Sequence, residues 1–487
     1  MFVAISVKQT QTNSPSRKFA GNKISNKIVF QVSVIGYLEK FVLCRDYVLP
    51  LIASPTRRRL ASGAFWGGVG GVVSRGAVLL TSFFLARILG QTQFGEYGVV
   101  NSTAAMLSAV AGLGVGTTAT KYVAELRNTD KARAGRIISL SSMVTWVSGS
   151  LYGVIFVVFA SWLATKTLAA PHLATVLRIS AISVALGVIN GAQNCSLSGF
   201  EAFRVAASIN VACGVGQSLL VLVGAYWGGL KGAVAGMAVS TLLTVTVSHG
   251  ALRLEMRRFG IRNGWREAWS EWPVLVSFSL PAFLTTMIAG PVFWGCNALL
   301  ANQPNGYNEL GVFNAANQWY AAVAFLPGLL TTAALPVLSE RYGAKDSAGN
   351  ARIMKGLMRL TAIVVIPLVM VLSLLSVVIM RGYGEAFEKG YLTLILSVAA
   401  AGAQCMTVPC WYVIMASSRM WVCFVMNCGW SAVLLIGTLC LIRHGAVGVA
   451  GARLIAFVIH GCWMYAYVVW AGSRLMVNGI DSVEEVA

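Results

Sequence analysis

The sequence predicts an all-α protein that crosses a membrane about twelve times. Of its 487 residues, 57% are hydrophobic and 11% are charged, and the mean hydropathy is +0.72. A water-soluble fold cannot bury so much apolar surface, whereas membrane helices expose it to lipid. From residue 60 onward, apolar segments of about twenty residues recur, and each is long enough to cross ~30 Å of hydrocarbon.

The first 59 residues have a different character from the rest of the chain. They are basic and rich in Ser, Asn and Lys, and they lack the apolar core near residue 10 that is typical of a signal peptide. We expect a poorly ordered cytoplasmic extension or a segment outside the native product, with an interfacial anchor as the alternative.

The predicted spans follow one another with short connections. Their approximate limits are 61–86, 96–116, 137–163, 174–195, 205–227, 231–252, 273–299, 311–335, 357–380, 391–416, 420–442 and 446–471. They group into a first half at 60–252 and a second half at 273–475, joined by a linker at 253–272 and followed by a tail at 476–487.

Basic residues in the connections predict the orientation. Lys and Arg gather in the 117–136, 253–272 and 338–356 connections, which lie on one side of the membrane if the span count holds. The opposite connections, such as 301–310, are short and nearly uncharged. The positive-inside rule then places both termini in the cytoplasm.

The 253–272 linker also carries apolar residues at helical spacing. These residues are Ile261, Trp265, Trp269 and Trp272, with Arg262 and Arg266 on other faces. The pattern predicts an amphipathic helix lying in the inner interface of the membrane, and a plain Trp-anchored loop is the alternative.

The chain repeats itself at an offset of 213 residues. The sequence EYGVVN at 96–101 matches ELGVFN at 309–314, and GAV at 232–234 matches GAV at 445–447. A constant offset predicts two pseudo-symmetric six-helix bundles of the same topology around a central cavity. Their two-fold axis would run along the membrane normal.

Arg75 lies near the middle of the first span, with few acidic residues within reach. A guanidinium near the bilayer midplane costs at least ~2.5–3.5 kcal/mol, so it faces a cavity or a partner. Because guanidinium binds phosphate through two parallel hydrogen bonds, Arg75 is the leading candidate for an anion site. The alternative is a structural arginine bonded to helix carbonyls.

Further candidates for substrate binding lie in other spans. Arg453 either lines the cavity or extends outward, and Arg178 lies about one turn inside its span, where outward extension is favoured. Polar side chains that could bond sugar hydroxyls, or simply join helices, are Asn101, Asn314, Asn317 and Gln318.

Two histidines lie within predicted spans, at His249 and His460. Imidazole titrates near neutral pH, so both are candidates for proton coupling, although a neutral hydrogen bond between helices is the favoured interpretation. No CxxC or His/Cys spacing appears among the ten cysteines, so we expect no metal, disulfide framework or cofactor.

The residues also resemble a known family. ARILG at 86–90 with FGEYG at 94–98, and GVFNAA at 311–316 with LPVLS at 335–339, resemble polysaccharide-export flippases, the Wzx-type O-antigen transporters. The stretch QTQ at 91–93 departs from that family, which often has proline and acidic residues there. The family belongs to the multidrug/oligosaccharidyl-lipid/polysaccharide exporter superfamily.

The resemblance implies a function without enzymatic chemistry. It implies alternating-access transport of an undecaprenyl-pyrophosphate-linked oligosaccharide across the bacterial inner membrane. It also implies a polysaccharide polymerase and glycosyltransferases as functional neighbours, and no nucleic acid partner.

Three other classes remain as alternatives. A cation-coupled multidrug antiporter needs buried carboxylates, but the acidic residues here fall in or beside connections. A membrane enzyme would need a sizeable outer loop carrying a nucleophile and base, and none is present. A peptidoglycan-precursor flippase typically has more helices than the twelve predicted here.

Overall fold

The computed structural model describes the backbone of residues 55–275, 279, 283, 287–331, 347–416 and 420–484. Side chains are described within 67–275, 279, 283, 287–325, 354–414 and 421–470. The predicted extension at 1–59 lies almost wholly outside these residues, as do residues 338–346 of the 338–356 connection.

Every described element is helical, as the apolar pattern predicts. The elements of the first part of the chain are α3 (Pro55–Ala111), α4 (Val115–Leu126), α5 (Lys131–Trp162), η2 (Leu163–Thr167), η3 (Pro171–Leu173), α6 (Ala174–Gly199), α7 (Phe203–Phe259) and η4 (Ala268–Glu271). Those of the second part are α9 (Ala289–Ala301), α10 (Gly306–Thr331), α12 (Ser347–Leu374), α13 (Ser376–Tyr383), η6 (Glu385–Gly390), α14 (Tyr391–Ala416), α15 (Met420–Leu441), η7 (Ile442–His444) and α16 (Gly445–Glu484).

Seven helical stretches of the described residues are long and apolar enough to cross a membrane. Three of these are interrupted by glycine in a conformation that side chains disfavour: Gly90 with φ 75°, Gly229 with φ 56° and Gly445 with φ 60°. Each interruption falls in the connection between two predicted spans, so glycine ends one helix and the chain reverses.

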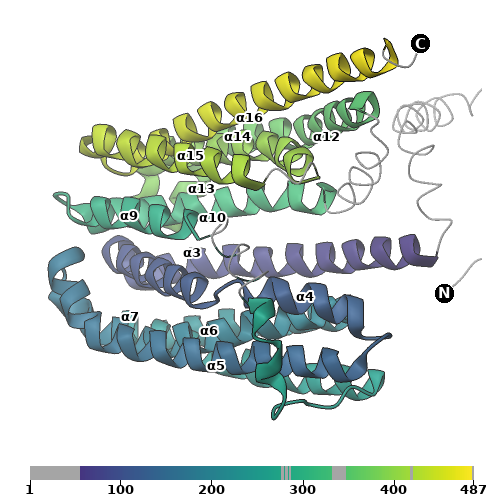
Figure 1. Cartoon of the computed structure of the whole chain (residues 1–487). Coiled ribbons are helices and arrows are strands. Elements are labelled where there is room, and N and C mark those ends of the chain that lie inside the picture. The colour runs from purple at the N-terminus through teal and green to yellow at the C-terminus, as the bar shows by residue number, and fades with distance from the viewer. Residues whose placement is uncertain are drawn as a thin grey trace, which may run out of the picture. The chain divides into compact units, whose positions relative to one another are not determined.

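Neighbouring helices of each part pack against one another (Figure 1). In the first part, α5 and α6, α6 and α7, and α4 and α6 are in contact. In the second part, α14 contacts α10, α12 and α16, and α15 contacts α16. Small residues permit the close approaches, since a Cβ on Gly224 would lie 2.2 Å from the carbonyl oxygen of Gly232.

The two parts meet where α3 crosses α10. A Cβ on Gly95 would lie 2.0 Å from the Tyr307 carbonyl oxygen, and one on Gly311 would lie 2.2 Å from that of Gln91. Gly98 and Gly311 are equivalent positions of the internal repeat, so the two copies of the motif pack on each other.

The linker differs from its prediction, and the amphipathic helix expected around 261–272 is wrong. Helix α7 continues to Phe259, and Gly260 with φ 69° ends it in a left-handed conformation. The following residues form no α-helix and contain only the short 3-10 turn η4. The linker lies on α5 instead: a Cβ on Gly135 would lie 2.1 Å from the Arg262 carbonyl oxygen.

We predict that Gly95→Ala lowers the stability of the folded protein by about 1–3 kcal/mol, because a methyl group there meets backbone of α10 that cannot turn away. The matched control is Gly76→Ala in the helical segment of α3 before Gly90, where a Cβ meets nothing within 4 Å. Thermal unfolding of the detergent-solubilised chain measures both. Equal midpoints for the two variants would contradict a tight α3–α10 contact.

Candidate functional site

Arg75 lies on the face of α3 that meets α10. Its guanidinium lies 5.8 Å from the centre of the Phe325 ring, and a Cβ on Gly71, one turn earlier, would overlap the same ring. The Arg75 side chain is exposed, and no carboxylate among the described residues pairs with it. It is therefore a positive charge that remains available beside α10.

Arg453 occupies an aromatic cage on another side of α10. Its guanidinium lies 4.7 Å from the Phe313 ring, 4.6 Å from the Tyr320 ring and 5.0 Å from the Phe293 ring. Cation–π attraction is strongest where water is excluded, and Arg453 is only 5% exposed. Its Nη1 donates to the Asn317 Oδ1 at 2.8 Å.

Two predicted substrate-binding residues, Arg453 and Asn317, are thus brought together. Tyr320 extends the cage by donating from its hydroxyl to the Gln404 Oε1 at 2.6 Å on α14. Among the described residues, no carboxylate neutralises this guanidinium. Burying a charge without a counter-charge is costly, so the cage compensates through the amide oxygen and the ring faces.

The two candidate histidines lie far from Arg75 in sequence and in different parts of the fold. His460 lies two turns beyond Arg453 on α16, is 8% exposed and contacts the Trp430 ring at 6.4 Å between centroids. Neither of its ring nitrogens has a hydrogen-bond partner among the described residues. His249 is half-buried near the end of α7.

Other candidates take different positions. Asn314 is buried, and its Nδ2 donates to the Gly95 carbonyl at 3.4 Å, so this residue joins α10 to α3. Asn101 is exposed on α3, and Gln318 is half-buried on α10. Arg178 is exposed and donates to the Ser161 hydroxyl on α5 at 2.8 Å, which agrees with an outward-facing side chain.

One end of the α3–α10 contact is closed by polar contacts that the sequence did not indicate. Arg87 donates to the Gly382 carbonyl at 2.8 Å, and Thr92 donates to the Asn308 Oδ1 at 2.5 Å. Asn302 and Tyr307 each donate at 2.7 Å to a carbonyl of the 167–168 segment. We call this set of contacts between the two parts of the chain the seal.

A carboxylate supports the seal in each copy of the repeat. Glu96 is 7% exposed, and its Oε1 lies 2.6 Å from the His172 Nε2 in η3, directly beyond the 167–168 segment. The equivalent Glu309 accepts from the backbone N–H of Ala446 at 2.8 Å, at the start of α16. The matched positions of these two residues in the repeat were the signal that could have identified both.

An all-helical bundle with cationic groups around one central helix, and a seal at one end, is the architecture of a membrane transporter. The sequence family described as polysaccharide biosynthesis protein matches residues 60–342, which is more than half of the chain. The chain belongs to this family.

The chain is also similar to named relatives and to solved structures. The chain is 26% identical over 312 residues to the EPS I polysaccharide export inner membrane protein EpsE of Ralstonia solanacearum, covering 62% of this chain and 69% of EpsE. It is 25% identical over 299 residues to the lipid III flippase of Escherichia coli K12, covering 59% of this chain and 69% of that protein. The fold is similar to the inward-facing conformation of a multidrug resistance MATE family transporter of the MOP superfamily, with a TM-score of 0.68 at 15% identity, covering 82% of this chain and 95% of that one.

We predict opposite effects for the two partners in the aromatic cage. Arg453→Met replaces the charge with an apolar side chain of similar size, so the thermal midpoint stays equal or rises. Asn317→Ala leaves the buried guanidinium without its acceptor and costs about 1.5–3 kcal/mol. Thermal unfolding in detergent measures both variants. A larger loss for Arg453→Met than for Asn317→Ala would mean that the arginine is needed for folding itself.

Proposed function

We propose that this protein is a flippase that moves an undecaprenyl-pyrophosphate-linked oligosaccharide from the inner to the outer leaflet of a bacterial inner membrane. The observation that carries the proposal is the pair of arginines beside α10, one exposed and one caged, with no carboxylate paired to either among the described residues. Such a path favours a polyanionic headgroup, since arginine binds phosphate oxygens with parallel hydrogen bonds.

Family membership supports the same cargo class. Two relatives carry names that refer to polysaccharide export and to a lipid flippase. Export of an anion is also favoured by a membrane potential that is negative inside, by ~2.3 kcal/mol per charge per 100 mV.

In the proposed architecture, twelve spans form two six-helix bundles, at 60–252 and 273–475, around a central cavity. The contact between the repeat motifs of α3 and α10 supports a two-fold axis between them. The basic connections favour cytoplasmic termini. The seal then lies at the outer end.

We assign roles to the candidate residues on this basis. Arg75 makes the first contact with the pyrophosphate, and Arg453 with Asn317 forms a second site deeper in the second half. Asn101 and Gln318 contact sugar hydroxyls, while Arg178 and Asn314 hold helices. His460, with both nitrogens unpartnered, is a better proton-coupling candidate than His249. A polymerase and glycosyltransferases are the proposed functional neighbours.

A charge series at Arg75 tests the cargo. In a strain that makes the cognate glycan but lacks its flippase, we expect Arg75→Lys to keep partial export and Arg75→Gln and Arg75→Ala to export nothing, because the path needs a cation. Surface polymer on gels is the readout, and membrane insertion is checked separately. Arg178→Gln, which loses only a contact to Ser161, is the matched control and exports normally. Full export by Arg75→Ala would refute the proposed site.

Alternating access requires the seal to open. In Thr92→Cys/Asn308→Cys, whose parent side chains are hydrogen-bonded, oxidation is expected to join α3 to α10 and to abolish export. Reduction restores export, and each single variant is unaffected by oxidant. Undiminished export by the fully cross-linked double variant would mean that these helices do not separate during transport.

A further inference from the structure

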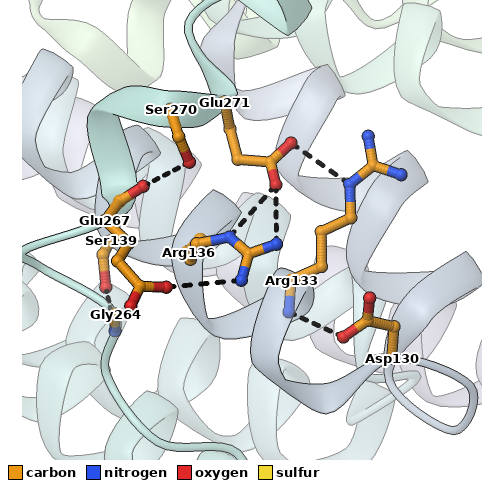
Figure 2. A network of polar contacts seen from close by, with 8 residues as sticks. All are labelled: Asp130, Arg133, Arg136, Ser139, Gly264, Glu267, Ser270 and Glu271. Atoms are coloured by element: carbon orange, nitrogen blue, oxygen red, sulfur yellow. Dashed lines mark hydrogen bonds and ion pairs between the residues drawn. The ribbon is translucent and has the colours of Figure 1, made fainter.

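The linker between the two parts of the chain is clamped to the start of α5 (Figure 2). Glu271 accepts from the Arg133 Nε at 3.1 Å through one oxygen and from the Arg136 Nε at 3.2 Å through the other. Glu267 pairs with Arg136 at 3.5 Å, and the backbone N–H of Gly264 donates to Ser139 at 3.1 Å. One carboxylate bridging two guanidinium groups fixes the linker far better than an isolated exposed pair does.

The clamp sorts the linker side chains into two sets. Those facing the protein are buried: Ile261, Ala268 and Glu271. Those left on the outside are exposed: Arg262, Trp265, Arg266, Trp269 and Trp272. We call this second set the linker surface.

The linker surface combines unpaired cations with uncovered indoles. Within the part of the chain that the structure describes, neither Arg262 nor Arg266 forms an ion pair, because Arg133 and Arg136 engage the nearby Glu267 and Glu271. Trp269 is 62% exposed and Trp272 is 51% exposed, which is costly in water for side chains of this size.

We propose that the linker surface binds the headgroups of anionic phospholipids. Tryptophan is favoured at the level of the headgroups, where its ring is half in the apolar region, and arginine pairs with lipid phosphate. Each basic residue near an anionic bilayer surface contributes ~1 kcal/mol. The clamp holds these residues in place before lipid arrives, so little conformational entropy is lost on binding.

The charge distribution favours lipid over the proposed substrate as the occupant. The arginines assigned to substrate lie beside α10, whereas the linker is attached to α5, which packs against α4, α6 and η4. Bound headgroups would hold the linker between the two parts of the chain at the membrane surface.

The test uses the full-length protein in neutral detergent, titrated with phosphatidylglycerol or phosphatidylcholine and read by native mass spectrometry. We expect the parent to retain phosphatidylglycerol selectively. Removing each arginine weakens that binding about 5-fold, and Arg262→Gln/Arg266→Gln weakens it about 25-fold. Arg443→Gln, an exposed arginine in η7 at the predicted opposite side, is the matched control and leaves binding unchanged.

Two further variants keep the result interpretable. Glu271→Gln releases the clamp while leaving the linker surface intact, and we expect binding to weaken because the surface is no longer held in place. Trp265→Ala/Trp269→Ala is expected to weaken retention of both lipids. Binding of phosphatidylglycerol by the double arginine variant within two-fold of the parent would overturn the proposal. So would arginine-dependent binding of inorganic pyrophosphate in place of lipid. The readout does not involve transport, so its failure leaves the flippase proposal standing.

Discussion

The contact between α3 and α10 is the constraint on which the rest of the structure depends. Gly71, Gly95 and Gly98 carry no side chain, so the Phe325 ring, the Tyr307 carbonyl and the Asn314 side chain of α10 lie directly against α3 backbone. The candidate groups lie on two sides of α10. Arg75 lies on the α3 side, and Arg453 approaches from α16. The contact is close because glycine leaves room for α10, and the Phe83 and Trp319 rings also meet across it.

Electrostatics explains why the two arginines differ in their surroundings. Hydrocarbon does not tolerate an uncompensated charge, so Arg453 is surrounded by ring faces and the oxygen of Asn317. Neutral partners of this kind stabilise the cation without cancelling its charge, and a carboxylate would cancel it. The Arg453 guanidinium is therefore held by neutral partners, with no carboxylate paired to it among the described residues. The exposed Arg75 lacks such a cage among the described residues and lies beside the Phe325 ring.

Much of the fold could be predicted from sequence, and the site could be predicted only in part. The length of the apolar segments predicted a helical membrane protein. The glycines at 90, 229 and 445 fall between predicted spans because chain reversal needs a left-handed residue there. The prediction of a helix in the linker was wrong because the helical spacing of its tryptophans says nothing about tertiary contacts. Gly260 ends α7, and Glu271 is drawn to two arginines far away in sequence, so the backbone follows α5 instead of closing its own helical bonds. The seal could not be predicted from the sequence for a similar reason, since most of its acceptors are backbone carbonyls, which every residue carries.

The internal repeat also shows where the two halves have diverged. Glu96 and Glu309 occupy equivalent positions, yet Glu309 accepts from the start of α16 while Glu96 faces His172. A backbone N–H is a permanent donor, and the N-terminus of a helix favours a carboxylate. The first copy of the repeat therefore sets a side chain of η3 opposite its carboxylate, whereas the second copy sets backbone there. The 167–168 segment, a few residues before His172, accepts from Asn302 and Tyr307, so the Glu96–His172 contact lies close in the chain to the seal. The two copies of the repeat thus share the position of a carboxylate but not its partner, and the difference lies beside the seal.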